Sequence, residues 1–278
     1  MDPKKTLGIS SHLYCDPLRG SGNGNTPFTW VSDAAASNAI GLRERRLDAA
    51  FLTPIDYARQ SSLYFIVPHI VAASAGVDGT ITLHVRDGLQ NISSIAVDPS
   101  SSSEIVLAKI ILAENFDLSP KIVPFSGSLE EALAKVDAAL LVGDPSLRAR
   151  EKHEAALDLV EEWNELTGLP YVHGFWCGRE HALTRGEIRL LQQTCADGLG
   201  GLDGISSRAP LTHALSGYSP RAIREYLEGL TFELSEEEEE SVREFSRYAF
   251  YHTILPDIPE LQFYGAPDGD DGDSPTAV

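Results

Sequence analysis

Apolar residues along this 278-residue chain fall into short continuous runs, and most of these runs are separated by helix-like segments. Short apolar runs are typical of parallel strands that are buried on both faces. We predict strands at 7–13, 48–52, 66–74, 80–85, 94–97, 121–124, 138–142 and 171–176. We predict helices at 33–46, 55–60, 104–115, 129–135 and 158–166, and then a mostly helical region with helices at 185–198, 220–227 and 235–250. Alternating strands and helices of this kind indicate an α/β fold.

A seven-residue pattern occurs twice in the chain, at 46–52 and at 135–141. Each copy has the order of a basic helix end, an acidic turn and an apolar strand, and each is followed by a loop that contains proline. Two copies of one strand unit predict two similar α/β lobes. Because open α/β sheets bind ligands at the carboxyl ends of their strands, we expect a ligand between the loops that follow these strands.

The predicted first lobe comprises residues 1–85 and 177–265, and the second comprises residues 86–176. The chain would cross between the lobes near 85 and 176, which predicts a two-strand hinge. Residues 266–278 contain several aspartates and almost no apolar side chain, so we expect a disordered acidic tail there.

The composition narrows the class of partner. A formal net charge of −19 disfavours nucleic acid and anionic membrane surfaces. No apolar segment is long enough for a transmembrane helix or for the core of a signal peptide. The three cysteines are widely spaced and fit neither a disulfide framework nor a zinc pattern. We therefore expect a cytoplasmic protein with a small-molecule ligand, and the sequence leaves its oligomeric state open.

Four consecutive serines, 100–103, open the predicted helix at 104–115. Serine hydroxyls beside the free N–H groups of a helix start can hold an anion. A capped helix start without a ligand explains the same run equally well. Gly143 and Asp144 follow the second copy of the repeated pattern at the same expected sheet edge, which favours a ligand site.

The facing edge of the first lobe would carry Tyr14, Asp16, Thr53 and the loop 76–80. Asp16 and Asp144 are candidate acids or bases, but an aspartate before a proline more often forms a turn. Four histidines lie in strand-like stretches without the spacing of metal ligands, and we expect structural roles for them: His12, His69, His84 and His173. The sequence has no dinucleotide-binding, P-loop or serine-hydrolase motif.

Several stretches together resemble the chorismate dehydratase family of the futalosine route to menaquinone. They read LTPIDYA at 52–58, VDPSS at 97–101, DAALLVGDPSL at 137–147 and LTGLPYV at 166–172. The resemblance extends from about residue 8 to residue 264, which covers most of the chain.

The resemblance implies a two-lobed periplasmic-binding-protein fold of type II with a central cleft. The implied reaction removes the ring hydroxyl and a neighbouring ring proton from chorismate and leaves aromatic 3-enolpyruvyl benzoate. It implies a small anionic carboxylate substrate, no cofactor and no metal. Tyr14 and Thr80 match catalytic positions of the family. The matching substrate-binding positions are Thr53, Gly76, Ser100, Ser101, Ser102, Ser103, Gly143 and Asp144.

The chain departs from the family's pattern around the expected site. Tyr14 stands where the family has an asparagine, Ser102 where it has an arginine, and Glu104 where it has a serine. Losing a cation and gaining a carboxylate disfavours a dianionic ligand at that helix start. Three alternatives therefore stay open: a diverged member that binds or converts another small carboxylate, an extracytoplasmic solute receptor of the same fold, and a later enzyme of the same route.

Overall fold

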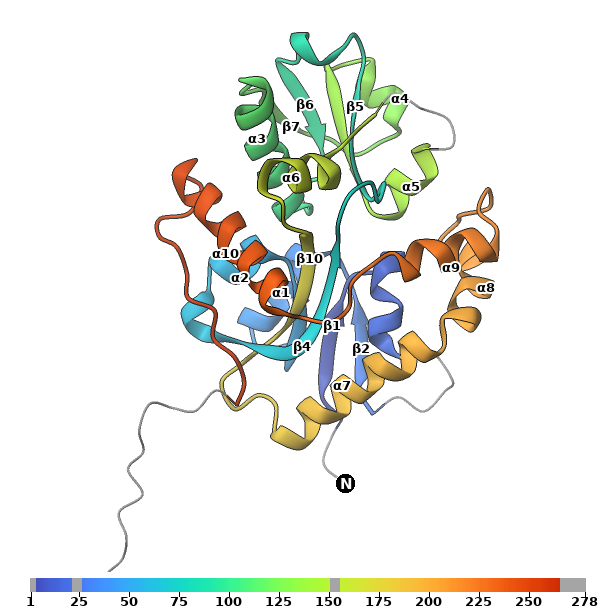
Figure 1. Ribbon diagram of the computed structural model, residues 1–278, viewed down its shortest axis with the longest axis vertical. Coiled ribbons are helices and arrows are strands. Elements are labelled where there is room, and N and C mark those ends of the chain that lie inside the picture. Colours follow the sequence, from blue (N-terminus) through green and yellow to red (C-terminus); the bar gives the residue numbers. More distant parts are fainter. Residues whose placement is uncertain (1–3, 22–26, 151–155, 266–278) are drawn as a thin grey trace, which may run out of the picture.

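The computed structural model describes residues 4–21, 27–150 and 156–265, and these form two α/β lobes, one above the other (Figure 1). The first sheet has the strand order β2 (Thr29–Ser32), β1 (Thr6–Ile9), β3 (Ala49–Leu52), β10 (Tyr171–Arg179) and β4 (Tyr64–Ser74). The second sheet has the order β7 (Lys121–Pro124), β6 (Ser94–Val97), β8 (Ala138–Val142), β5 (Ile81–Val85) and β9 (Ala156–Asp158). The tail expected at 266–278 lies outside the described residues.

The two sheets share one topology, and the repeated sequence pattern marks the same strand in each. β3 pairs in parallel with β1 and antiparallel with β10, while β8 pairs in parallel with β6 and antiparallel with β5. Each of the two strands leads into a helix, α2 (Pro54–Ala58) or α5 (Asp144–Arg150). β3 and the first three residues of β8 are buried, which explains why both read as apolar runs. The prediction of a two-lobed α/β fold is confirmed.

Strand pairing corrects the expected sheet membership at both crossings. Sequence analysis places the strand at 80–85 in the first lobe, whereas β5 pairs with β8 and β9 of the second sheet. It assigns the strand at 171–176 to the second lobe, whereas β10 pairs with β3 and β4 of the first sheet. The chain therefore crosses between the sheets at 75–80 and again at 168–170, earlier than expected in each case.

Buried hydrogen bonds tie the two crossings together. His173 Nε2 on β10 lies 2.7 Å from Ser74 Oγ and 3.1 Å from Asp78 Oδ2. Asp158 Oδ2 accepts a hydrogen bond of 2.7 Å from Gly79 N. Burial opposes ionisation of Asp78, but hydrogen bonds from His173 and Ser74 outweigh it and lower the pKa of the carboxyl. The joint between the lobes therefore contains a buried, charged carboxylate that is fully hydrogen-bonded.

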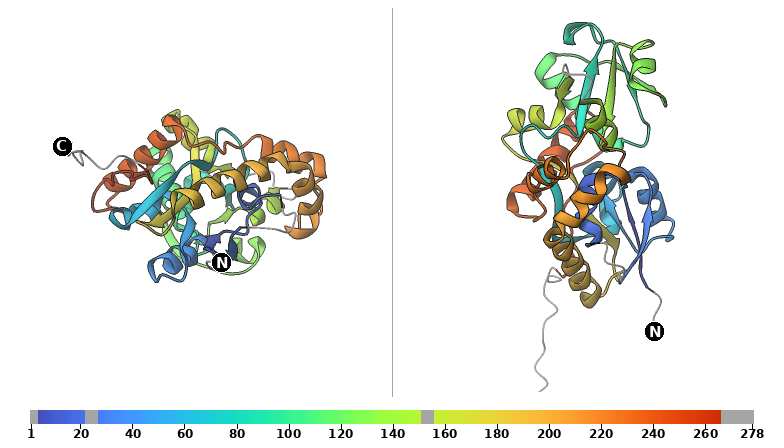
Figure 2. Two further views of the ribbon diagram at one scale, coloured as in Figure 1. Left: turned by 90° about the horizontal axis from the view of Figure 1, so that it is seen from below. Right: turned by 90° about the vertical axis from the view of Figure 1, so that its right-hand side faces the viewer.

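The helices that flank the sheets differ in which lobe they cover. They are α1 (Ala35–Arg43), α3 (Ser102–Phe116), α4 (Leu129–Leu133), α6 (Leu159–Thr167), α7 (Arg185–Gly200), α8 (Leu202–Thr212), α9 (Pro220–Glu228) and α10 (Glu236–Tyr251). Short 3₁₀ helices lie at Leu13–Cys15, Pro17–Arg19, Ser61–Leu63 and Leu89–Asn91. α7, α8 and α9 lie along the first lobe (Figure 2). Among the described residues, no helix combines the length and the apolar character that a membrane span requires.

Helix α10 spans the joint between the lobes. Its start is fixed by a capping box, in which Ser235 and Glu238 satisfy each other's backbone N–H groups. Further along, α10 contacts α2, α3 and β10. Phe245 and Ala249 of α10 join Ile55 of α2 in the apolar cluster of the second lobe. The lobes are therefore packed together along one flank.

Candidate functional site

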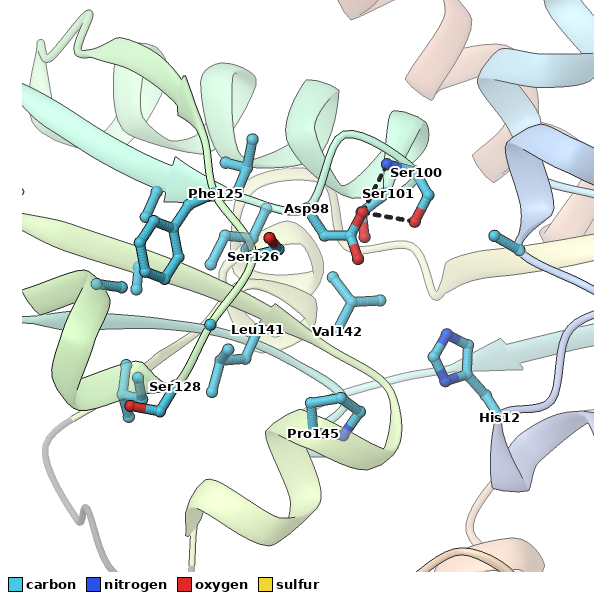
Figure 3. A pocket seen from close by; sticks show the side chains of 18 of the residues that line it. His12, Asp98, Ser100, Ser101, Phe125, Ser126, Ser128, Leu141, Val142 and Pro145 are labelled. Atoms are coloured by element: carbon cyan, nitrogen blue, oxygen red, sulfur yellow. Dashed lines mark hydrogen bonds between the residues drawn. The ribbon is translucent and has the colours of Figure 1, made fainter.

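A cavity of about 400 Å³ opens between the carboxyl end of the second sheet and the loop that follows β1 (Figure 3). That volume is in the range of small-molecule sites. Residues from the second lobe form most of the wall, and four come from the first lobe: Ser10, Ser11, His12 and Ala34. The cavity therefore lies at the sheet edge where the sequence predicts a ligand.

The wall contributed by the second lobe has an apolar floor and a hydroxyl rim. Val97, Leu141 and Phe125 are among the apolar residues that line it. At the rim, Asp98 Oδ1 accepts hydrogen bonds from Ser100 N at 2.9 Å and from Ser100 Oγ at 2.7 Å. This Asx turn forms directly before α3 and explains the local sequence, because aspartate followed by proline and serine is typical of such turns.

His12 lies at the mouth of the cavity and points toward the second lobe (Figure 3). Its ring packs against Gly143, where an added Cβ would lie 2.0 Å from His12 Nδ1. Gly143 also has a φ of +66°, so glycine is required there for two reasons. Burial lowers the pKa of His12 below the ordinary 6.5, although the charge of Asp144 acts in the opposite direction. A neutral imidazole at this place can accept a proton.

Sequence analysis assigns His12 a structural role, and the structure places it in the cavity wall instead. One sequence signal could have indicated this position. The residue stands in the loop after the first strand, two residues before Tyr14, and such loops face the ligand in open α/β sheets.

Tyr14 is 5 % exposed and does not line the cavity. Its ring stacks between His12, at a centroid distance of 5.4 Å, and His173, at 4.8 Å. Burial, and then the neighbouring Cys15 and Glu104, raise the pKa of its hydroxyl well above the ordinary value, so the hydroxyl stays protonated. Tyr14 thus lies directly behind the histidine that faces the cavity.

The other predicted site residues, apart from Ser100 and Ser101, do not line the cavity either. Thr80 is fully buried, and its hydroxyl donates to Asp78 at 2.7 Å. Thr53 is 4 % exposed, and its hydroxyl donates to Asp56 at 2.9 Å. Gly76 occupies the crossing between the sheets with a φ of +70°. In this arrangement the two threonines bind neighbouring carboxylates within the joint.

The serine run divides between two roles. Ser100 and Ser101 line the cavity, as the sequence predicts for this helix start. Ser102 Oγ donates to both carboxylate oxygens of Asp56 at 2.9 Å, and Ser103 Oγ accepts from Ile55 N at 3.3 Å. Successive positions on a helix point about 100° apart, so four adjacent serines cannot all face one ligand. The last two bind α2 of the first lobe.

Asp144 also joins the lobes, through Leu13 and His213 of the first lobe. Its Oδ1 accepts from Leu13 N at 2.9 Å, and its Oδ2 lies 2.7 Å from His213 Nδ1. The second ring nitrogen of His213 lies 2.9 Å from Asp16 Oδ2. Burial acts to raise the pKa of Asp144, but the hydrogen bonds from His213 and Leu13 outweigh it and lower that pKa. Sequence analysis leaves Asp16 and Asp144 between turn and acid-base roles. In the structure both carboxylates bind the same histidine, His213.

Glu104 is 4 % exposed in the first turn of α3. Burial raises the pKa of its carboxyl to about 7. A hydrogen bond from its own backbone N–H acts to lower this pKa, and the charge of the nearby Asp56 acts to raise it. The carboxyl is therefore largely uncharged below pH 7. This departure from the family's pattern consequently repels an anionic ligand less than the sequence suggests.

The charged residues around the cavity are few. Among the described residues that line it, none is lysine or arginine, and Asp98 is the carboxylate at its rim. The same part of the chain contains no group of three His, Cys, Asp or Glu side chains arranged to hold a metal ion. An anionic group in the cavity would therefore bind through hydroxyl and backbone N–H donors.

Comparison with solved structures shows which fold this is. A protein from Archaeoglobus fulgidus superposes with a TM-score of 0.73 at 14% identity, covering 91% of this chain and 98% of that one. The alkanesulfonate-binding protein of Xanthomonas axonopodis pv. citri, bound to MOPS, gives 0.60 at 16% identity over 93% and 96%. A conserved Candida albicans protein described as having the generic periplasmic binding protein fold gives 0.57 at 11% identity over 92% of each chain. The chain has this fold.

Sequence comparison identifies the family. A chorismate dehydratase of Campylobacter jejuni is 26% identical over 152 residues, which is 54% of this chain and 54% of the relative, so the match spans about half the length of that protein. The family described as menaquinone biosynthesis matches residues 6–251, nearly the whole chain. On the strength of that match, this chain belongs to the menaquinone biosynthesis family.

Proposed function

We propose that this protein is a lyase of the chorismate dehydratase type, which converts chorismate to 3-enolpyruvyl benzoate and water. One observation carries the proposal: His12, whose pKa is lowered by burial, faces a cavity of about 400 Å³ between the lobes of a member of this family. The similarity to the Campylobacter jejuni chorismate dehydratase supports the choice of substrate.

The proposed reaction uses the two walls of the cavity differently. The ring of chorismate lies on the apolar floor near Val97 and Leu141. His12 accepts the ring proton, and the electron pair of the broken C–H bond forms the new ring double bond. The C–O bond to the ring hydroxyl breaks, and the departing hydroxide takes the proton from His12 and leaves as water. Hydroxyls at the rim, such as Ser101, donate hydrogen bonds to the departing oxygen.

A specific observation favours a second candidate, a family member that binds or converts another small ligand. Chorismate carries two carboxylates, whereas the described lining of the cavity has no lysine or arginine and includes the carboxylate of Asp98. Charge-assisted pairs with arginine are the usual way to hold a carboxylate. A ligand with fewer negative charges would fit this lining better.

Incubation of the purified protein with chorismate separates the candidates, with product followed by chromatography. We expect product from the wild type and a loss of about 100-fold or more in His12→Gln, the usual effect of removing a general base. His181→Gln is the matched control, because the His181 side chain is 89% exposed. No product and no thermal shift with chorismate would reject the lyase, and a thermal shift without turnover would favour the second candidate.

A further inference from the structure

Three side chains form a chain of hydrogen bonds across the joint between the lobes, beside the cavity. Asp16 lies between the 3₁₀ helices Leu13–Cys15 and Pro17–Arg19, His213 caps the C-terminus of α8, and Asp144 begins α5 of the second lobe. His213 Nε2 lies 2.9 Å from Asp16 Oδ2, and His213 Nδ1 lies 2.7 Å from Asp144 Oδ2. His213 is 9% exposed and Asp144 is 8% exposed.

The geometry determines the protonation state of His213. An ionised carboxylate accepts hydrogen bonds only, and each ring nitrogen of His213 faces one. Both nitrogens must therefore donate, which requires the imidazolium form. Burial opposes this charge, but the hydrogen bonds to Asp144 and Asp16 outweigh it and raise the pKa of His213 to about 9.

Three further titratable groups lie near this histidine and its carboxylate partners. Arg19 Nη1 lies 3.9 Å from Asp16 Oδ1, and Arg148 Nη1 of α5 donates to the carbonyl of His213 at 2.8 Å. The His12 ring is near enough to interact electrostatically with both His213 and Asp144. Only Arg19 among these groups pairs with a carboxylate of the chain, so loss of the proton from His213 leaves a hydrogen bond to one of the two carboxylates without its donor.

This chain of hydrogen bonds also fixes the position of His12, the residue that faces the cavity. Asp144 Oδ1 accepts from Leu13 N, the residue after His12. Gly143, the residue before Asp144, packs directly against the His12 ring. A second bond on the same side, from Tyr218 OH to the Leu147 carbonyl at 2.9 Å, holds α5 against the first lobe. The position of His12 therefore depends on how Asp144 is held.

We propose that His213 is a positioning residue. Its imidazolium binds Asp144 of α5 to Asp16 of the first lobe, an interaction that we term the clasp, and thereby holds His12 in the cavity. The kinetic part of this inference rests on the proposed function, whereas the clasp itself does not. On opening, Asp144 moves away from His213, and the ring loses one of its two carboxylate partners. The proton is then bound less tightly, so closure takes up a proton as the pH falls below the closed-state pKa of about 9. The closed form is most populated below that pKa and declines as pH rises through 9.

Energy transfer between dyes on the two lobes measures the clasp without substrate. Gln90→Cys on the second lobe and Leu211→Cys on α8 provide exposed labelling positions, and the three native cysteines are buried. We expect high transfer at pH 6.5 that falls as pH rises past 9. His213→Gln, which keeps one donor and loses the charge, should give low transfer throughout, and His181→Gln should match the wild type.

A second variant keeps the test decisive if His213→Gln does not fold. Asp16→Asn retains an acceptor for the ring but removes a charge that supports the imidazolium, so the midpoint of the transition should move about one pH unit lower or more. Transfer that is constant from pH 6 to 10 in the wild type, or an unchanged midpoint in Asp16→Asn, would overturn the proposal.

Kinetics with chorismate then tests the positioning role. If only a fraction of free His213→Gln is closed, KM rises by the inverse of that fraction, and kcat/KM loses its decline above pH 9. A structural role alone would lower the amount of folded protein and leave the pH profile of the remainder unchanged. If the wild type shows no turnover, the lyase proposal fails, and the energy-transfer experiment still decides whether the clasp exists.

Discussion

Replacing Glu104 with glutamine should stabilise the protein at alkaline pH and leave it unchanged in acid. The carboxyl is 4% exposed, and its pKa of about 7 compares with an ordinary value of 4.5. That difference corresponds to about 3 kcal/mol of unfolding free energy. Because the folded-state pKa is raised, the stability is fully present below pH 4.5 and is lost as pH rises through 7. Glutamine has the same size and no charge, so Glu104→Gln should avoid this loss.

Urea unfolding between pH 4.5 and 8.5 measures the effect. We expect the wild type and Glu104→Gln to have similar free energies of unfolding at pH 4.5 and to differ by about 3 kcal/mol at pH 8.5. Glu165→Gln is the matched control, because this residue of α6 is exposed, and it should follow the wild type. A constant difference between Glu104→Gln and the wild type at every pH would refute the reasoning.

Two further substitutions test the contacts between the lobes. Gly143→Ala should lower the free energy of unfolding by about 1–3 kcal/mol because of its positive φ, and it should also reduce turnover because the new Cβ displaces the His12 ring. Gly88→Ala is the control, because Gly88 also has a positive φ, +92°, but no atom lies within 4 Å of the new Cβ. Its thermal unfolding temperature should fall while its activity persists. An equal loss of activity in Gly143→Ala and Gly88→Ala would contradict the account. Ser102→Ala removes a donor from the buried carboxylate on α2 and should cost about 1–3 kcal/mol in urea unfolding. Ser100→Ala, whose hydroxyl binds an exposed carboxylate, should change stability far less, and equal losses in the two serine variants would refute the distinction.

The sequence predicts the scaffold well where the signal is local. β3 and β8 were recognisable because buried strands read as apolar runs and the same pattern marks both. The assignment of β5 to the first lobe was wrong, because an apolar run has the same appearance whichever sheet it joins. β2 has mostly exposed residues and β9 has three residues, so neither produces a detectable run.

The candidate site was predictable only in part. Ser100 and Ser101 follow a strand at the expected sheet edge, and the structure places both in the cavity. Ser102 and Ser103 turn away because the helix has already begun, which a run of identical residues cannot reveal. The partners of His213 lie 69 and 197 positions away along the chain. Contacts of that separation depend on the fold, so the local pattern around His213 contains no sign of them.

The pH dependence of kcat/KM with chorismate tests the central claim most directly. The base must be neutral to accept a proton, and burial lowers the pKa of His12 below 6.5. We therefore predict 3-enolpyruvyl benzoate as the product, with a rate that falls toward acid with a midpoint below pH 6.5 and that is lost in His12→Gln. Absence of product, or a His12→Gln variant as active as the wild type, would contradict the account.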